Sequence, residues 1–131
     1  MARGLSQVNW ANKVLDHMYR AVASTAPAGH FIKIHTGDPG ASGATAASSV
    51  TTRPSATFSA ASAGAVALSN TPTWASWAGT NGEVVSHISG WDASTAGTFM
   101  DSAALTVSKT MNTGDTLTLT SKNVSLAPIA A

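Results

Sequence analysis

The C-terminal half of the chain consists of short runs in which apolar and polar residues alternate, separated by turn residues. Residues 83–88 (EVVSHI) and 115–120 (DTLTLT) are two such runs, and residues 112–115 (NTGD) are a typical turn sequence. Alternation with a period of two predicts strands that have one face in a core. The opposite faces carry Ser, Thr and Ala with few charges, a composition that suits contact with other protein better than an ordinary solvated surface.

The spacing of these runs predicts the fold class. Strands are expected over residues 31–36, 51–59, 65–69, 73–77, 84–89, 98–102, 104–110, 117–120 and 123–126. Eight or nine short strands at such intervals predict a mainly β protein, an antiparallel β-sandwich or jelly roll. Pro39 and Gly40 fit the central positions of a type II turn. The low-complexity residues 41–49 (ASGATAASS) predict a mobile loop.

One amphipathic α-helix is predicted before the strands, over residues 6–23, with Ser6 as its N-cap. Its apolar positions are spaced three and four apart, at Val8, Ala11, Leu15, Met18 and Val22. We expect a single domain over residues 1–131, with this helix followed by the sandwich at 30–126. The helix either covers one end of its own sandwich or reaches onto a neighbour, so Val8, Leu15, Met18 and Val22 are candidate interface residues.

The composition favours a protein that is covered in an assembly. Ala, Ser and Thr fill nearly half of the 131 positions, and charged residues reach 10%, against roughly 25% in a typical soluble domain. The net charge of +1 gives little protection against association. We therefore expect much of the surface to be covered by other protein in a complex.

Several partner classes do not fit the sequence. The seven basic residues are scattered, which argues against nucleic acid as a partner. No segment approaches the roughly 20 apolar residues of a membrane span, so no membrane is expected. Asn9, Asn12 and Asp16 interrupt any apolar stretch of a signal peptide, so we expect synthesis in the cytoplasm without secretion.

The candidate reactive groups do not form a recognisable site. There is no cysteine, and the four histidines have no spacing typical of metal ligands. The carboxylates mostly fall in turns or at strand ends, where they hydrogen-bond nearby amides. No nucleophile elbow, phosphate loop or dinucleotide motif is present. We predict no catalytic residue, no cofactor and no metal.

Three tryptophans could serve as contact residues. Exposed Trp74, Trp77 or Trp91 could stack on sugars or anchor a protein partner, whereas buried rings would fill a core built from small residues. Because Trp74 and Trp77 are three apart on a predicted strand, one is expected in the core and the other outward at an interface.

An ordered set of short motifs adds a family resemblance. The motifs are residues 34–40 (IHTGDPG), 61–64 (ASAG), 86–93 (SHISGWDA), 95–99 (TAGTF), 103–109 (AALTVSK) and 112–117 (NTGDTL). In this order they resemble a family of small virion proteins of tailed bacteriophages, commonly labelled tail fibre or minor structural proteins. The resemblance implies a β-sandwich located in a virion, with no catalytic residues.

Two functions follow from the composition and the resemblance together. The first is a non-enzymatic decoration protein, a symmetric homo-oligomer in the form of a trimer, that binds the major capsid protein on the capsid exterior and stabilises the shell. The alternative is a tail fibre or minor tail protein near the adsorption apparatus, in contact with other tail proteins and able to bind glycans through its tryptophans. Repeated contacts around a shell would multiply even a modest interface.

Overall fold

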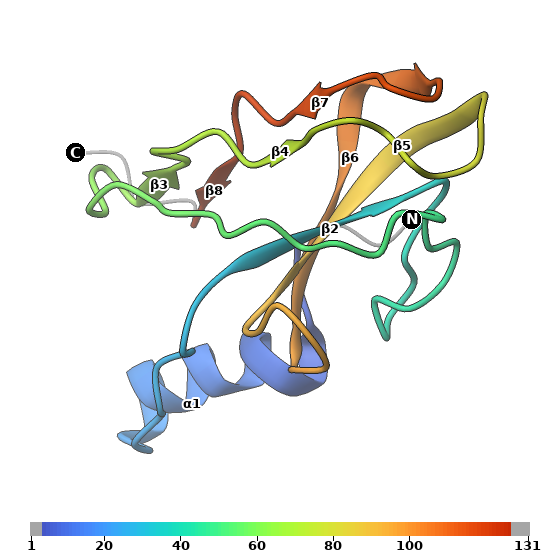
Figure 1. The fold of residues 1–131 in the computed structure, drawn as a ribbon. Coiled ribbons are helices and arrows are strands. Elements are labelled where there is room, and N and C mark those ends of the chain that lie inside the picture. The colour runs from blue at the N-terminus through green and yellow to red at the C-terminus, as the bar shows by residue number, and fades with distance from the viewer. Residues whose placement is uncertain (1–3, 127–131) are drawn as a thin grey trace.

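A computed structural model describes residues 4–126. One antiparallel sheet of four strands, in the order β1-β6-β5-β2, forms the main layer (Figure 1). Its strands are β1 (Gly4–Leu5), β2 (Phe31–His35), β5 (Glu83–Trp91) and β6 (Phe99–Met111). Two short antiparallel ribbons form the second layer, β3 (Ala65–Ala67) with β8 (Asn123–Ser125) and β4 (Thr73–Trp74) with β7 (Leu117–Thr118).

The core lies between the main sheet and the ribbons. Alternate residues of β2, Ile32 and Ile34, are fully buried, and Val85 and Ile88 join them from β5. The other layer contributes Trp74 from β4. The predicted mainly β class, with antiparallel strands and one N-terminal helix, is therefore confirmed.

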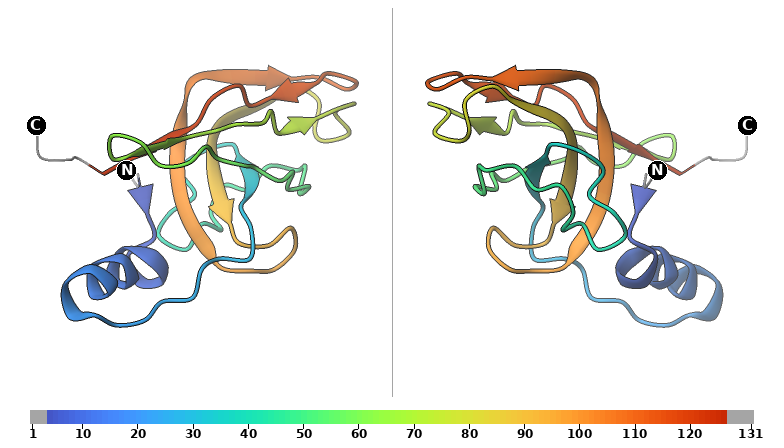
Figure 2. Two further views of the ribbon diagram at one scale, coloured as in Figure 1. Left: turned by 90° about the vertical axis from the view of Figure 1, so that its left-hand side faces the viewer. Right: turned by 90° about the vertical axis from the view of Figure 1, so that its right-hand side faces the viewer.

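β6 replaces two predicted strands and is longer than either. Residues 98–102 and 104–110 were expected to form separate strands, but β6 runs without interruption from Phe99 to Met111. Figure 2 shows β6 curving from the main sheet over to the ribbon layer. A strand that bends in this way links two layers without a loop.

The segment predicted as an edge strand at 51–59 is extended but forms only isolated bridges, at Ser55 and Phe58. It lies beside β2, where the amide of Ile32 donates to the carbonyl of Pro54. Because Pro54 has no amide hydrogen of its own, a continuous ladder cannot form here.

Residues 41–49 form hydrogen-bonded turns, in contrast to the predicted mobile loop. Gly40 has a φ of 70°, as the second central residue of a type II turn requires, and the amide of Thr45 donates to the carbonyl of Pro39. At the end of the loop, the Ser48 hydroxyl donates to the carboxylate of Glu83.

Candidate interaction surfaces

The N-terminal helix begins as predicted but is irregular and shorter. Ser6 caps it, and the first turn is a π-helix, η1 (Gln7–Ala11), followed by α1 (Asn12–Arg20). Ala21 has a left-handed backbone (φ 53°), which ends the helix before the predicted residue 23. Val22 therefore lies beyond the helix.

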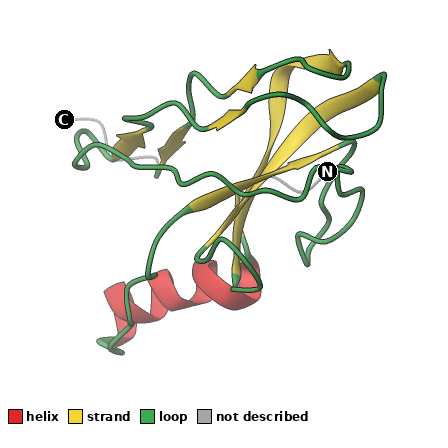
Figure 3. Ribbon diagram, in the orientation of Figure 1, coloured by secondary structure: helices red, strands yellow, loops and turns green. Residues whose placement is uncertain are grey.

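The helix does not cover its own sandwich. It projects from one end of the β layers (Figure 3), and none of its residues is buried. Its first turn is attached to β6, where the Asn9 side-chain amide donates to the carbonyl of Phe99 at 3.0 Å. The alternative in which the helix reaches onto a neighbour remains.

The predicted interface residues of the helix are exposed in the monomer. The exposed fractions are 80% for Val8, 55% for Leu15, 61% for Met18 and 44% for Val22. We call these four residues the exposed helix face, although Val22 lies just beyond the helix rather than within it. Each fully buried aliphatic side chain contributes ~1.5–3 kcal/mol relative to an exposed one, so covering this face would be strongly favourable.

Trp74 and Trp77 are both in the core, which makes the prediction of one outward ring wrong. Only 4% of Trp74 and 2% of Trp77 are exposed. β4 ends at Trp74, and Ser76 has a left-handed backbone (φ 51°) that breaks the strand alternation. Each indole N–H is satisfied by a backbone carbonyl, of Thr52 and Thr80 respectively.

Trp91 is half-buried, and one of its faces is occupied. The Arg53 guanidinium lies 4.2 Å from the ring centroid and also donates to the carbonyl of Ala96. The Phe99 ring is 5.7 Å away. None of the three tryptophans thus offers the wide exposed platform that sugar stacking requires.

A buried ionic cluster joins the C-terminal segment to the main sheet. Lys122 Nζ donates to Asp101 Oδ2 at 2.6 Å and to His30 Nε2 at 3.1 Å. Burial and the positive charge of Lys122 lower the pKa of His30 to about 4, although Asp101 opposes the shift. His30 therefore stays neutral and accepts through Nε2.

Sequence reasoning missed this cluster because its three residues are far apart in the chain. The one sequence feature that points to the cluster is Gly90, a glycine within β5. A Cβ atom at this position would lie 2.6 Å from His30 Nε2. Glycine inside a strand often marks a site where another group approaches closely.

His35 is a buried structural residue. It accepts from the Ser89 hydroxyl at 2.7 Å through Nε2, and Nδ1 donates to the carbonyl of Thr45 at 2.9 Å. Burial lowers its pKa, consistent with a neutral ring. This contact ties the loop after β2 to the sheet. Within residues 4–126, no three metal-ligating side chains form a group suited to a metal ion.

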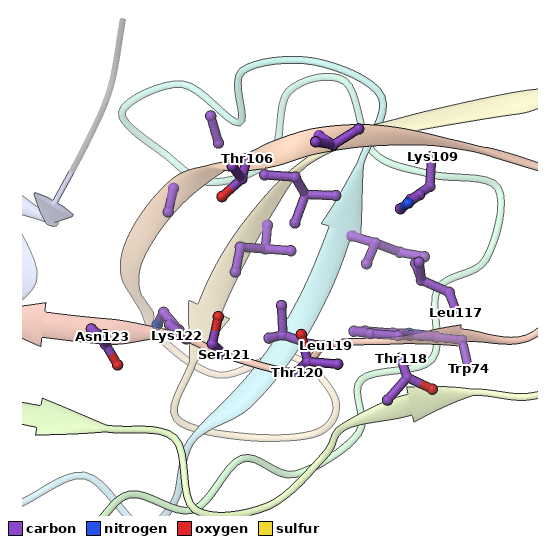
Figure 4. A pocket seen from close by; sticks show the side chains of 16 residues that line it. Trp74, Thr106, Lys109, Leu117, Thr118, Leu119, Thr120, Ser121, Lys122 and Asn123 are labelled. Carbon is purple, nitrogen blue, oxygen red and sulfur yellow. The ribbon is translucent and has the colours of Figure 1, made fainter.

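A groove of about 470 Å³ separates β6 from residues 117–123 (Figure 4). Its floor consists of core side chains, including Ile34, Ile88 and Leu119, and its rim carries hydroxyl groups such as those of Thr106 and Thr120. No sequence pattern predicts this groove, because the groove depends on how the two layers are spaced.

A family model described as podophage GP4 fiber I protein gp80 matches residues 4–127. The chain belongs to this family. It is accordingly a structural protein of tailed-phage virions, as the resemblance of its motifs implied. No curated protein matches the chain. No helix within the described part of the chain has the length and apolar character needed to span a membrane.

Proposed function

We propose that this chain is a non-enzymatic component of a phage tail fibre and that it assembles through its exposed helix face. The family description supports the fibre location. The observation that carries the mode of assembly is the exposed helix face, whose four apolar side chains are between 44% and 80% exposed.

The proposed assembly is a symmetric homo-oligomer, a trimer, held to neighbouring tail proteins. Within α1, the exposed Leu15 and Met18 are three residues apart and lie on one side of the helix, which suits packing against a similar helix. The low charge content of the chain fits subunits that bury part of their surface against one another.

Decoration of the capsid through the major capsid protein is the second candidate function. The low charge content supports it, because charged residues are depleted at the buried centre of protein–protein interfaces. The glycan-binding version of the fibre role loses support, since Trp74 and Trp77 are buried.

Copy number and position in the particle separate the two candidates. Quantitative gel densitometry of purified virions would give a small multiple of the tail symmetry for a fibre, and a number that matches the capsid lattice for a decoration protein. Immunogold labelling would place the protein on the tail or on the head. Labelling of the head at lattice copy number would contradict the fibre proposal.

A further inference from the structure

β6 separates from β5 where the groove begins. Val85 pairs with Lys109 and His87 with Ala104, so Ser86 alone faces residues 105–108 of β6. This large bulge bends β6 out of the main sheet, as extra residues in one strand of a pair do.

The outer edge of β6 is also free beyond its first residues. β1 pairs with β6 only at Asp101 and Ser102. No strand within residues 4–126 pairs with the outer edge from Ala103 onward. After its turn, the chain returns as β7, but β7 pairs with β4 and not with β6.

The wall opposite β6, residues 117–123, makes its backbone hydrogen bonds on the side that faces away from the groove. The amide of Leu119 donates to the carbonyl of Pro72, and the carbonyl of Lys122 accepts from the amide of Leu68. These bonds point toward the segment that contains β4, away from β6. The space between β6 and residues 117–123 therefore has the position of a missing strand.

The side chains around the groove define what would fill it. Core residues such as Ile34, Ile88 and Leu117 form an apolar floor, and Lys109 lies at the rim (Figure 4). No carboxylate is among the residues that line the groove. The volume of about 470 Å³ is within the roughly 300–1,000 Å³ of typical ligand sites.

We propose that this groove accepts an extended strand of another protein, which pairs with the free edge of β6. Because side chains alternate along a strand, we expect the bound strand to be apolar at every second position, where its side chains face the floor of the groove. It carries an acidic side chain opposite Lys109. Strand addition of this kind draws affinity from main-chain hydrogen bonds and specificity from the side-chain pockets.

The geometry favours a strand over a helix. Residues 104–109 provide about 20 Å of edge at ~3.3 Å per residue. A helix pairs its own backbone groups and is ~10 Å wide, so it would leave the β6 edge unpaired. The helix of this chain contacts the other end of β6, at Phe99, so the groove proposal does not depend on the exposed helix face.

The test uses the purified full chain and three synthetic heptapeptides. The first peptide alternates valine and threonine and ends in aspartate, the second ends in lysine instead, and the third has a central proline. Hydrogen exchange of residues 104–109 and isothermal titration calorimetry report binding. We expect the aspartate peptide to protect these amides and to bind at least about threefold more tightly than the lysine peptide. We expect no binding of the proline peptide.

The variant Lys109→Glu sharpens the test, because it should reverse the preference between the aspartate and lysine peptides. Asn12→Asp, a charge change on the distant helix, is the matched control and should leave the preference unchanged. Absence of protection, or equal binding of all three peptides, would overturn the proposal. Protection of residues 104–109 in the protein without peptide, in an associated state, would identify a second copy as the occupant and also overturn it.

Discussion

Lys122 shows how a buried charge can determine which segments stay together. Its ammonium group is held between Asp101 and His30, and the three groups come from the C-terminal segment, β6 and the residue before β2. Such a pair adds little stability over apolar residues of the same shape, but loss of one partner leaves an uncompensated charge. The cluster is therefore a test of the observed packing of the C-terminal segment.

We expect Lys122→Met to lower the free energy of unfolding by about 3–5 kcal/mol, because Asp101 would stay buried without its cation. Urea unfolding followed by tryptophan fluorescence measures this. The control Lys109→Met removes an exposed cation and should change the free energy by less than about 1 kcal/mol. Equal effects of the two substitutions would show that Lys122 is not buried in an ion pair.

His30 makes stability depend on pH. Its folded pKa of about 4 is below the ordinary 6.5, so between these values the unfolded chain binds a proton that the folded chain does not. The contribution of His30 to the free energy of unfolding is fully present above pH 6.5. It is lost as the pH decreases toward 4, which lowers the free energy of unfolding by up to ~3 kcal/mol. The lowered pKa of His35 acts in the same direction.

Urea unfolding at pH 7 and pH 5 tests this dependence. The variant His30→Gln removes the titrating group, so its stability should fall less between the two pH values than that of the wild-type chain. The remaining decrease is assigned to His35. A variant with the full wild-type decrease would contradict the assignment to His30.

At the scale of elements, the loop after β2 is fixed by close packing. Gly43 has a φ of 70°, and a Cβ atom there would lie 2.6 Å from Phe99 Cγ. Gly114 also has a positive φ, of 89°, but has nothing within 4 Å of the same position. A side chain at either position would have an unfavourable backbone conformation, but only a side chain at Gly43 would also clash with a neighbour. Comparing the two positions therefore distinguishes backbone strain from steric overlap.

We expect Gly43→Ala to destabilise the protein by about 1–3 kcal/mol more than Gly114→Ala, because only the first substitution also overpacks the Phe99 ring. Thermal and urea unfolding of the two variants measure the difference. Equal destabilisation would mean that residues 41–49 do not pack on Phe99 as described.

The sequence predicts structure that depends on neighbouring residues well, and it predicts structure that depends on the packing of the two layers poorly. The period-two run at 31–36 and the cap at Ser6 depend on neighbouring residues and are confirmed. The path of β6 depends on its bulge, and the burial of both Trp74 and Trp77 depends on the left-handed Ser76. Neither feature has a signal in hydrophobic periodicity. The interface role of the helix stays a prediction.

At the scale of the whole molecule, a chain with few charged residues and an exposed apolar helix face fits the subunit role proposed above. The helix projects from the β layers (Figure 2), so a partner can cover it without disturbing the core. Stability and assembly are thus separable. A substitution on the exposed helix face should affect assembly while the fold remains.

Quantitative mass spectrometry of purified virions that carry Leu15→Asp tests this most directly. The control Lys13→Gln lowers the net charge by the same amount, but on the opposite, polar side of the same helix. We expect the control to be incorporated at the wild-type copy number. We expect Leu15→Asp to be lost from particles by at least about tenfold, although its free energy of unfolding stays within ~0.5 kcal/mol of the wild-type value. Incorporation of Leu15→Asp at the wild-type copy number would contradict assembly through the helix.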